Sequence, residues 1–167
     1  MAVHIRQLPP ERLDEFMTVF FKILRAEFPG YTPQVHDYFE KTAYSKENFK
    51  YWLSYNMKTI YVALNELSQI VGFAVVDAPY GGVSLCRWLG VQKEYQRKKI
   101  GSTLIETWIE LAKKQKCHKV ELAAQPEAKI FYEKVGLTLE GKRNVSYFGI
   151  DQYVFGRVIG SFSSEQF

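Results

Sequence analysis

The spacing of apolar residues along this chain changes between a period near two and a period near 3.6, and these changes mark the predicted elements. Apolar residues recur at helical spacing in 11–28 and 102–116, which predicts two helices with one broad apolar face each. Runs rich in β-branched and aromatic residues, bounded by turn residues, predict strands. The predicted strands are 2–8, 60–64, 70–76, 83–91, 119–124, 137–147 and 152–159, and two further helices are predicted after Ser45 and over 125–137.

The predicted order is β-α-α-β-β-β-α-β-α-β-β, an α/β (α+β) pattern that fits a mixed sheet of about six to seven strands with helices on both faces. Strands 83–91 and 119–124 are joined through a helix, so we expect them to run parallel. Pro and Gly residues in 28–33 predict a break after the first helix, followed by an aromatic-rich connection to Tyr44. We expect a single domain spanning 1–167.

Composition narrows the classes of protein that remain. Of the 167 residues, 47% are hydrophobic and 16% are aromatic, which is enough for a proper core. The net charge of +4 suits an anionic ligand, whereas a nucleic-acid-binding protein would more often show a longer basic stripe. No apolar run approaches a membrane span, and the N-terminal residues lack the apolar centre of a signal peptide. We therefore expect neither nucleic acid nor a membrane as a partner.

The two cysteines bear on metal binding and on location. Cys86 and Cys117 form neither a disulfide framework nor a metal-ligand spacing, so no metal is expected. Cys86 falls within a predicted buried strand, where we expect a small core side chain. This use of cysteine is typical of a reducing compartment, and we expect a cytoplasmic protein. The sequence leaves open whether it forms a homodimer.

A basic turn between a strand and a helix carries the first chemical signal. An apolar strand leads into Val91–Ser102, in which Arg97, Lys98 and Lys99 stand just before Gly101. The start of a helix presents unpaired backbone N–H groups and the positive end of the helix dipole, so it favours an anion. Glycine allows close backbone approach, and the three cations add full charges. The turn therefore predicts a pyrophosphate cradle.

This turn resembles the acyl-CoA-binding motif of the GNAT N-acetyltransferase superfamily, Gln/Arg-x-x-Gly-x-Gly/Ala after a strand. The chain matches it with Gln96-Arg-Lys-Lys-Ile-Gly101, in which Lys99 replaces the first glycine. A second segment, Gln125–Leu137, is similar to the family's Asn-x-x-Ala-x-x-Phe-Tyr-Glu-Lys-x-Gly-Phe, with Gln for Asn and Leu for the last Phe. Both motifs stand in the family's order, and the resemblance covers roughly residues 60–160.

The resemblance implies an enzyme that transfers an acetyl group from acetyl-CoA to a primary amine of a small molecule or a protein, by direct attack in a ternary complex. It implies that strands 83–91 and 119–124 splay apart around the pantetheine arm, and that the first is bulged near Leu89–Val91. Tyr132 takes the position of the general acid that protonates the leaving thiolate. The residues implied in binding acetyl-CoA are Leu89, Gly90, Val91, Gln96, Arg97, Lys98, Lys99, Gly101, Ser102, Gln125, Ala128 and Phe131. The alternative is a protein of the same fold that binds CoA with little catalytic activity.

The general base and the amine acceptor stay open at this stage. Strand 83–91 has no carboxylate, where many relatives place one. The proton of the amine would then be removed either by a water chain or by a residue of the aromatic connection. The candidate residues are His36, Asp37 and Glu40. An exposed loop is the commoner setting for a histidine such as His36. By family analogy, aromatic side chains would wall the acceptor site: Tyr31, Tyr38, Phe39, Tyr44, Tyr147 and Phe148.

Overall fold

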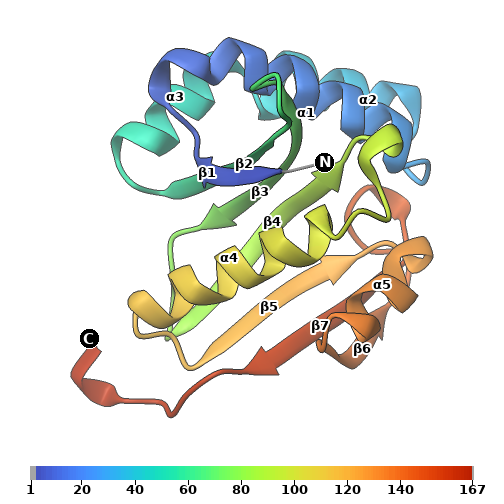
Figure 1. The fold of residues 1–167 in the computed structure, drawn as a ribbon. Helices are drawn as coiled ribbons and strands as arrows, with labels where there is room; N and C mark the ends of the chain where they lie inside the picture. Colours follow the sequence, from blue (N-terminus) through green and yellow to red (C-terminus); the bar gives the residue numbers. More distant parts are fainter. Residues whose placement is uncertain (1–2, 167) are drawn as a thin grey trace.

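The computed structural model describes residues 3–166, which form a seven-stranded sheet with helices on both faces (Figure 1). The strands are β1 (His4–Gln7), β2 (Lys58–Leu64), β3 (Ile70–Asp77), β4 (Val83–Val91), β5 (Lys119–Ala124), β6 (Thr138–Arg143) and β7 (Gln152–Val158). The helices are α1 (Leu13–Glu27), α2 (Pro33–Tyr38), α3 (Lys46–Ser54), α4 (Ile100–Lys114) and α5 (Lys129–Lys134). The strand order is β1-β2-β3-β4-β5-β7-β6, with β4 and β5 parallel and the other neighbours antiparallel. The predicted mixed α/β fold and its parallel pair are confirmed.

Two apolar cores lie on opposite faces of this sheet. Helix α4 crosses in front of the strands in Figure 1, and its fully buried Trp108 donates a hydrogen bond of 2.9 Å to Ser84 Oγ of β4. On the other face, Phe16 and Phe20 of α1 pack edge-on against Phe49 of α3, with ring centroids 5.4 and 5.6 Å apart. Burying each such ring contributes roughly 1.5–3 kcal/mol, so these contacts fix α1 and α3 against the sheet.

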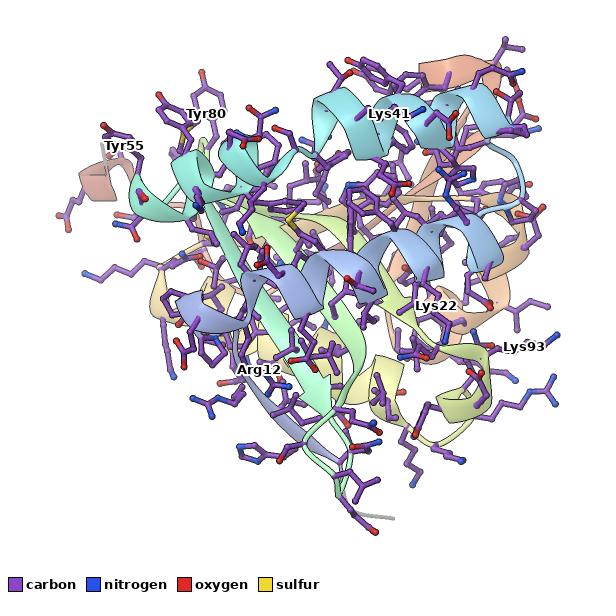
Figure 2. The ribbon with its side chains drawn as sticks, turned by 90° about the horizontal axis from the view of Figure 1, so that it is seen from above. Arg12, Lys22, Lys41, Tyr55, Tyr80 and Lys93 are labelled. Carbon is purple, nitrogen blue, oxygen red and sulfur yellow. The ribbon has the colours of Figure 1, made fainter. Side chains whose placement is uncertain are left out.

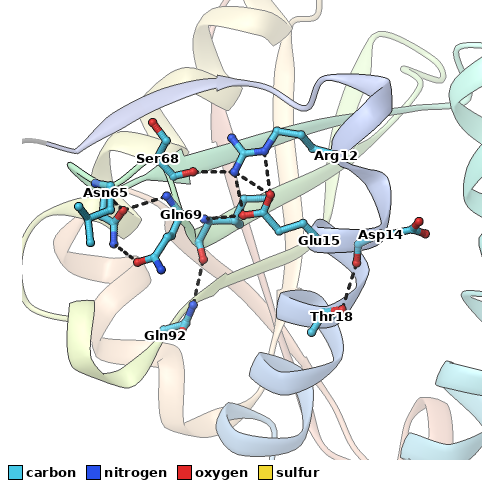
Figure 3. Close-up of polar contacts among 10 residues, drawn as sticks. Arg12, Asp14, Glu15, Thr18, Asn65, Ser68, Gln69 and Gln92 are labelled. Atoms are coloured by element: carbon cyan, nitrogen blue, oxygen red, sulfur yellow. Dashed lines mark hydrogen bonds and ion pairs between the residues drawn. The ribbon is translucent and has the colours of Figure 1, made fainter.

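A polar network holds the β2–β3 hairpin against the start of α1 (Figure 3). The Arg12 guanidinium donates to Glu15 Oε1 at 2.7 Å and to the Ser68 carbonyl oxygen at 2.6 Å. The Glu15 carboxylate also accepts from the Ile70 backbone N–H at 3.3 Å. Asn65 closes the turn, because its Oδ1 accepts backbone N–H bonds from two and four residues ahead, at 3.0 and 2.9 Å. The hairpin is thereby fixed beside the strand that lines the site.

Charged side chains surround the helices and leave the cores apolar. Figure 2 looks down from above and shows Arg12, Lys22 and Lys41 directed outward around α1 and the segment after α2. Tyr55 and Tyr80 are also exposed, at 68% and 91% of their surface. Within residues 3–166, no helix combines the length and the apolar character needed to cross a membrane.

Strands β4 and β5 separate after a short paired segment. The register joins Val83–Leu85 to Lys119–Glu121, and the remaining residues of the two strands diverge. The splay implied by the sequence resemblance is therefore present. Because β4 continues along β3 while β5 continues along β7, the sheet opens between β4 and β5 at their C-terminal ends.

A bulge in β4 changes which side chains face each core. Cys86 and Trp88 pair with consecutive residues of β3, which leaves Arg87 as an extra residue. The extra residue reverses the alternation of the strand, so that Cys86 packs in the core under α4 and Trp88 in the core under α1. The bulge was expected near Leu89–Val91, and that position is wrong, since those residues pair regularly with β3.

The connection after α1 also differs from the prediction, because most of it is helical. It contains α2 and a π-helical turn over Phe39–Ala43. Thr32 caps α2, with its hydroxyl oxygen accepting from the Val35 N–H at 3.3 Å. Pro33 occupies the first turn, where the missing N–H costs nothing. The predicted break after α1 is confirmed, because residues 28–32 separate α1 from α2. The additional helix beginning at Pro33 was not predicted, and the order is β-α-α-α-β-β-β-α-β-α-β-β.

Candidate active site

A cavity of about 1,100 Å³ opens where β4 and β5 separate. Its walls come from the end of α1, β4, the basic turn before α4, the ends of β5 and β7, and α5. The predicted acid Tyr132 lines it, together with the predicted cofactor residues Leu89, Gly90, Val91, Gln96, Arg97, Lys99, Gly101, Ser102, Gln125, Ala128 and Phe131. Lys98 is the predicted residue that is missing from the lining.

The first turn of α4 is an open anion site on this cavity. Lys99 precedes the helix, and among the described residues no side chain caps it and no acidic residue lies in its first turn. The first intrahelical bond runs from the Thr103 N–H to the Lys99 carbonyl oxygen at 3.0 Å. The N–H groups of Ile100, Gly101 and Ser102 therefore remain available to a ligand. Together with the helix dipole they favour a phosphate.

Lys99 stands where the motif usually has glycine, and its backbone takes a conformation that glycine adopts readily. Its φ is 62°, and Arg97, two residues earlier, has a φ of 59°. An L-residue in the left-handed region costs roughly 1–2 kcal/mol, so the basic turn carries strain at two positions. With this backbone conformation, the side chains of Arg97 and Lys99 both line the cavity next to the start of α4.

Lys98 folds back onto the turn that carries it. Its ammonium donates to the Glu94 carbonyl oxygen at 3.1 Å and lies 5.4 Å from the centre of the Tyr95 ring. The expected contact between Lys98 and the pyrophosphate therefore finds no support in the structure, because Lys98 does not line the cavity.

The last residue of α1 ties the two sequence motifs together. Gln96 Nε2 donates to the Glu27 carboxylate at 2.8 Å and to the Val91 carbonyl oxygen at 3.1 Å. The Glu27 carbonyl oxygen in turn accepts from Gln125 Nε2. The Gln96 side chain thus holds the turn against α1 and β4, and its backbone N–H donates to the Lys93 carbonyl oxygen at 3.2 Å. Gln125 Oε1 is buried without a partner among the described residues, so it is suited to receive a ligand N–H.

Tyr132 is buried and still reaches the cavity. Only 7% of its surface is exposed, and its ring packs against Phe131 and Phe155 with centroids 5.0 and 5.5 Å apart. Burial raises the pKa of Tyr132 above its ordinary value, and the nearby Cys86 acts in the same direction. Burial also raises the pKa of the Cys86 thiol to about 12, and this thiol donates to the Trp88 carbonyl oxygen at 3.4 Å. Both groups stay protonated at neutral pH, and Cys86 is the core residue that was expected.

An aromatic wall covers the α1 side of the cavity. Its members are Phe28, Tyr31, Phe39, Tyr44, Trp88, Tyr147 and Phe148. Trp88 Nε1 donates to the Tyr44 hydroxyl oxygen at 2.7 Å, which fixes two of these rings. Burial raises the pKa of Tyr31 to about 12, so its hydroxyl is neutral. Tyr38, also expected here, is absent from the lining and instead lies behind Phe148, with ring centroids 6.1 Å apart.

The three side chains considered as general bases lie outside the cavity lining. His36 is buried on α2 rather than exposed on a loop, and its ring packs edge-on against Tyr31 with centroids 5.9 Å apart. Asp37 and Glu40 both accept from Arg25, at 2.9 and 2.8 Å. The structure therefore does not bring these groups to the reacting end of the cavity.

Three carboxylates that sequence reasoning missed do line the cavity: Glu27, Glu121 and Glu127. Glu121 pairs with Leu85 in the last β4–β5 step before the strands separate, so it stands at the closed end of the splay. Lys119 lies 3.1 Å from this carboxylate. The alternation of β5 places Glu121 opposite the core positions Val120 and Leu122, but the sequence alone does not reveal that a cavity opens on that face.

The geometry agrees with comparisons to known proteins. Residues 56–137 match the family described as an acetyltransferase (GNAT) domain. Residues 56–137 therefore form a GNAT acetyltransferase domain. The matched GNAT segment runs from the start of β2 to the end of the second motif, so it contains both the α4 cradle and Tyr132. A comparison with curated protein sequences gave no match.

Solved GNAT structures share the fold over nearly the whole chain. The PaiA N-acetyltransferase of Thermoplasma acidophilum, determined with coenzyme A, has a TM-score of 0.80 at 23% identity and covers 95% of this chain and 100% of its own. A GNAT-family acetyltransferase of Staphylococcus aureus Mu50 has a TM-score of 0.72 at 20% identity, with 94% and 99% covered. Ard1 of Thermoplasma volcanium has a TM-score of 0.70 at 19% identity, with 96% and 100% covered. At these identities the likeness shows the fold.

Proposed function

We propose that this GNAT protein transfers an acetyl group from acetyl-CoA to a primary amine, by direct attack while both substrates are bound. The observation that carries the proposal is a single cavity shared by the open start of α4, Tyr132 and the aromatic wall. The acyl donor would enter from the α4 side and the amine from the α1 side, so that they meet where β4 and β5 separate.

The cavity residues at the start of α4 and just after β5 fit the chemical groups of acetyl-CoA. The open N–H groups of α4, with Arg97 and Lys99, suit the phosphates. Gln125 Oε1, buried without a partner in the described part of the chain, suits an amide N–H of the pantetheine arm. When bound, acetyl-CoA supplies an acetyl group activated as a thioester. Acetyl-CoA acts as a substrate in this transfer.

Tyr132 would protonate the leaving sulfur in this proposal. A phenol of ordinary pKa about 10 can donate to a thiolate of ordinary pKa about 8.5. Burial disfavours the charged form of both groups, which keeps the Tyr132 hydroxyl protonated until a thiolate develops beside it. Among the described residues this hydroxyl has no hydrogen-bond partner, so it is free to donate into the cavity.

Glu121 is our candidate for the group that accepts the proton of the attacking amine. It is the cavity carboxylate at the closed end of the splay, whereas Glu127 stands in the 3-10 turn before α5. Because a general base contributes about 10²–10⁴-fold, Glu121→Gln should lower kcat within that range at unchanged CoA affinity. Glu127→Gln is the matched control and should stay within a few-fold of the wild type. Equal activity of the two variants would remove Glu121 from the proposal.

The proposed function is tested by mixing the protein with acetyl-CoA and a panel of amines while free thiol is measured. The panel includes polyamines, amino acids, aminoglycosides and short peptides. Thiol release with at least one amine, absent without protein, is the expected result. CoA binding without thiol release on any amine would instead support the alternative, a GNAT-fold protein that binds CoA with little catalytic activity.

A further inference from the structure

Two side-chain oxygens of the cavity are buried without a hydrogen-bond partner among the described residues: Gln125 Oε1 and Gln152 Oε1. Gln125 is accounted for by the proposed donor site. Gln152 belongs to neither sequence motif and has no such role. Buried amide oxygens in folded proteins almost always find a donor, and a residue that lines a cavity can receive one from a bound ligand.

The strand register shows which part of the cavity Gln152 serves. Tyr153 of β7 pairs with Ala124 of β5, and one further step of this antiparallel register sets Gln152 beside Gln125. Directly opposed residues of antiparallel strands share a face. Alternate residues of β5 ending at Ala124 fill the core under α4, so the two glutamines face the α1 side. The bond from Gln125 to the carbonyl oxygen of Glu27, at the end of α1, agrees with this. Gln152 therefore lies beside Gln125, the proposed donor contact, on the face of the sheet that carries the aromatic wall, where the acceptor would meet the acyl group.

Arg143 indicates what kind of donor Gln152 receives. It pairs with Gln152 in the β6–β7 register and lines the same cavity. Within residues 3–166 its guanidinium has no ion pair or hydrogen bond that would neutralise it. Glu27, Glu121 and Glu127 also line the cavity, but Arg143 is the charged residue paired with Gln152, so an ammonium group placed at Gln152 Oε1 would be repelled by it at short range. A neutral amide N–H satisfies Gln152 Oε1 without that repulsion.

We infer that Gln152 is a specificity-determining residue, whose Oε1 accepts an amide N–H adjacent to the reacting amine of the acceptor. The inference rests on the proposed acetyl transfer and names its substrate class. The class is amines that carry a peptide-like N–H, such as peptide N-termini and aminoacyl amides, in preference to diamines and polyamines. The acceptor side chain would lie against the rings of Tyr31 and Phe148, which are 6.0 Å apart between centroids.

The test compares two acceptors that differ by one N–H group. Alanyl-alaninamide has the amide, and alanyl-lactamide has an ester oxygen in its place. The wild type should prefer the amide by about 5–30-fold in kcat/KM, the effect of one hydrogen bond to a buried acceptor. Gln152→Met keeps the size of the side chain and removes the acceptor oxygen, so the preference should disappear. Gln152→Glu restores an acceptor oxygen and should restore the preference. Gln115→Met, at the exposed end of α4, should leave it unchanged.

A binding experiment gives a readout without turnover. Titration of the two acceptors into the CoA complex by calorimetry should show the same preference in the wild type and its loss in Gln152→Met. Equal binding and equal kcat/KM of the two acceptors in the wild type would overturn the inference, as would a preference for butane-1,4-diamine over the amide. In both cases the acetyl transfer itself would stand. If no amine in the panel caused thiol release, the proposed function would be overturned. The calorimetry would still decide the role of Gln152.

Discussion

A Cβ atom added to Gly101 would lie 2.9 Å from Cζ of Phe131. The glycine in the first turn of α4 therefore makes room for a ring from the second motif as well as for a ligand. Phe131 lines the cavity and also contacts Tyr132, with ring centroids 5.0 Å apart. Any side chain at position 101 thus disturbs the surroundings of the proposed acid as well as the phosphate cradle.

Gly101→Ala should weaken the rise in melting temperature that CoA causes, because the added methyl group displaces Phe131 and narrows the cradle. Overpacking of this kind costs about 1–3 kcal/mol, and the better helix propensity of alanine offsets up to about 1 kcal/mol of this, so the free protein should not gain stability. Gly141→Ala is the matched control, since its added Cβ meets nothing within 4 Å. Thermal unfolding with and without CoA checks both. A normal CoA response in Gly101→Ala would show that the cradle lies elsewhere.

Removal of charge at Arg97 or Lys99 should weaken CoA binding, and removal at Lys98 should not. The first two line the cavity, whereas Lys98 is engaged by the Glu94 carbonyl oxygen. All three side chains are exposed, so each real contact should be worth only about 2- to 10-fold in affinity. Titration calorimetry of the three Gln variants at low and high salt checks this. Equal losses of CoA affinity in all three variants would mean that the net positive charge of the turn attracts the phosphates, with no contribution from the position of each side chain.

Tyr132→Phe should keep the fold and CoA affinity but lower kcat by about 10²–10⁴-fold, because only the proton donor is lost. The stability cost should be small, since the hydroxyl has no protein partner among the described residues. An aryl thioester, whose thiol leaves without protonation, should reduce the loss. Steady-state kinetics with both donors measures this. If the variant turned over at the wild-type rate, solvent would be the proton source.

His36 should make stability fall as the solution becomes mildly acidic. Burial lowers the pKa of His36 below the ordinary 6.5, and the nearby charge of Arg25 acts in the same direction, against a hydrogen bond with the Phe28 backbone and the charge of Asp37. The unfolded chain therefore binds more protons than the folded one near and below pH 6.5, so stability is lost as pH falls through this range and is present above it.

The measurement is the melting temperature between about pH 7.5 and about pH 5.5. His36→Gln should flatten the dependence relative to the wild type, because the titrating group is gone. His4→Gln, at an exposed position on β1, is the control and should leave the slope unchanged. A slope that survives in His36→Gln would assign the acid sensitivity to other groups.

Local signals in the sequence were sufficient to predict several elements. The bounds of β4 and β5 were predicted as the structure has them, because apolar runs between turn residues define a strand without reference to its neighbours. The cap at Ser45 was likewise predicted, and its hydroxyl oxygen accepts from the Asn48 N–H at 3.2 Å. The same kind of signal did not reveal the helix that begins at Pro33, since a proline that ends one helix and a proline that begins another look alike in the chain.

Tertiary structure decided which of the candidate side chains meet. Lys98 and Lys99 are adjacent in sequence, but only Lys99 faces the cavity. Gln152 comes beside Gln125 through the pairing of β7 with β5, which no local pattern encodes. The one-residue bulge at Arg87 places Trp88 on the face of β4 that packs under α1, where it forms part of the aromatic wall. The sequence thus identified the residues of each motif. The direction of each side chain depends on contacts between segments that are far apart in the chain. There, burial and strand register, rather than local preference, determine the free energy of the folded arrangement.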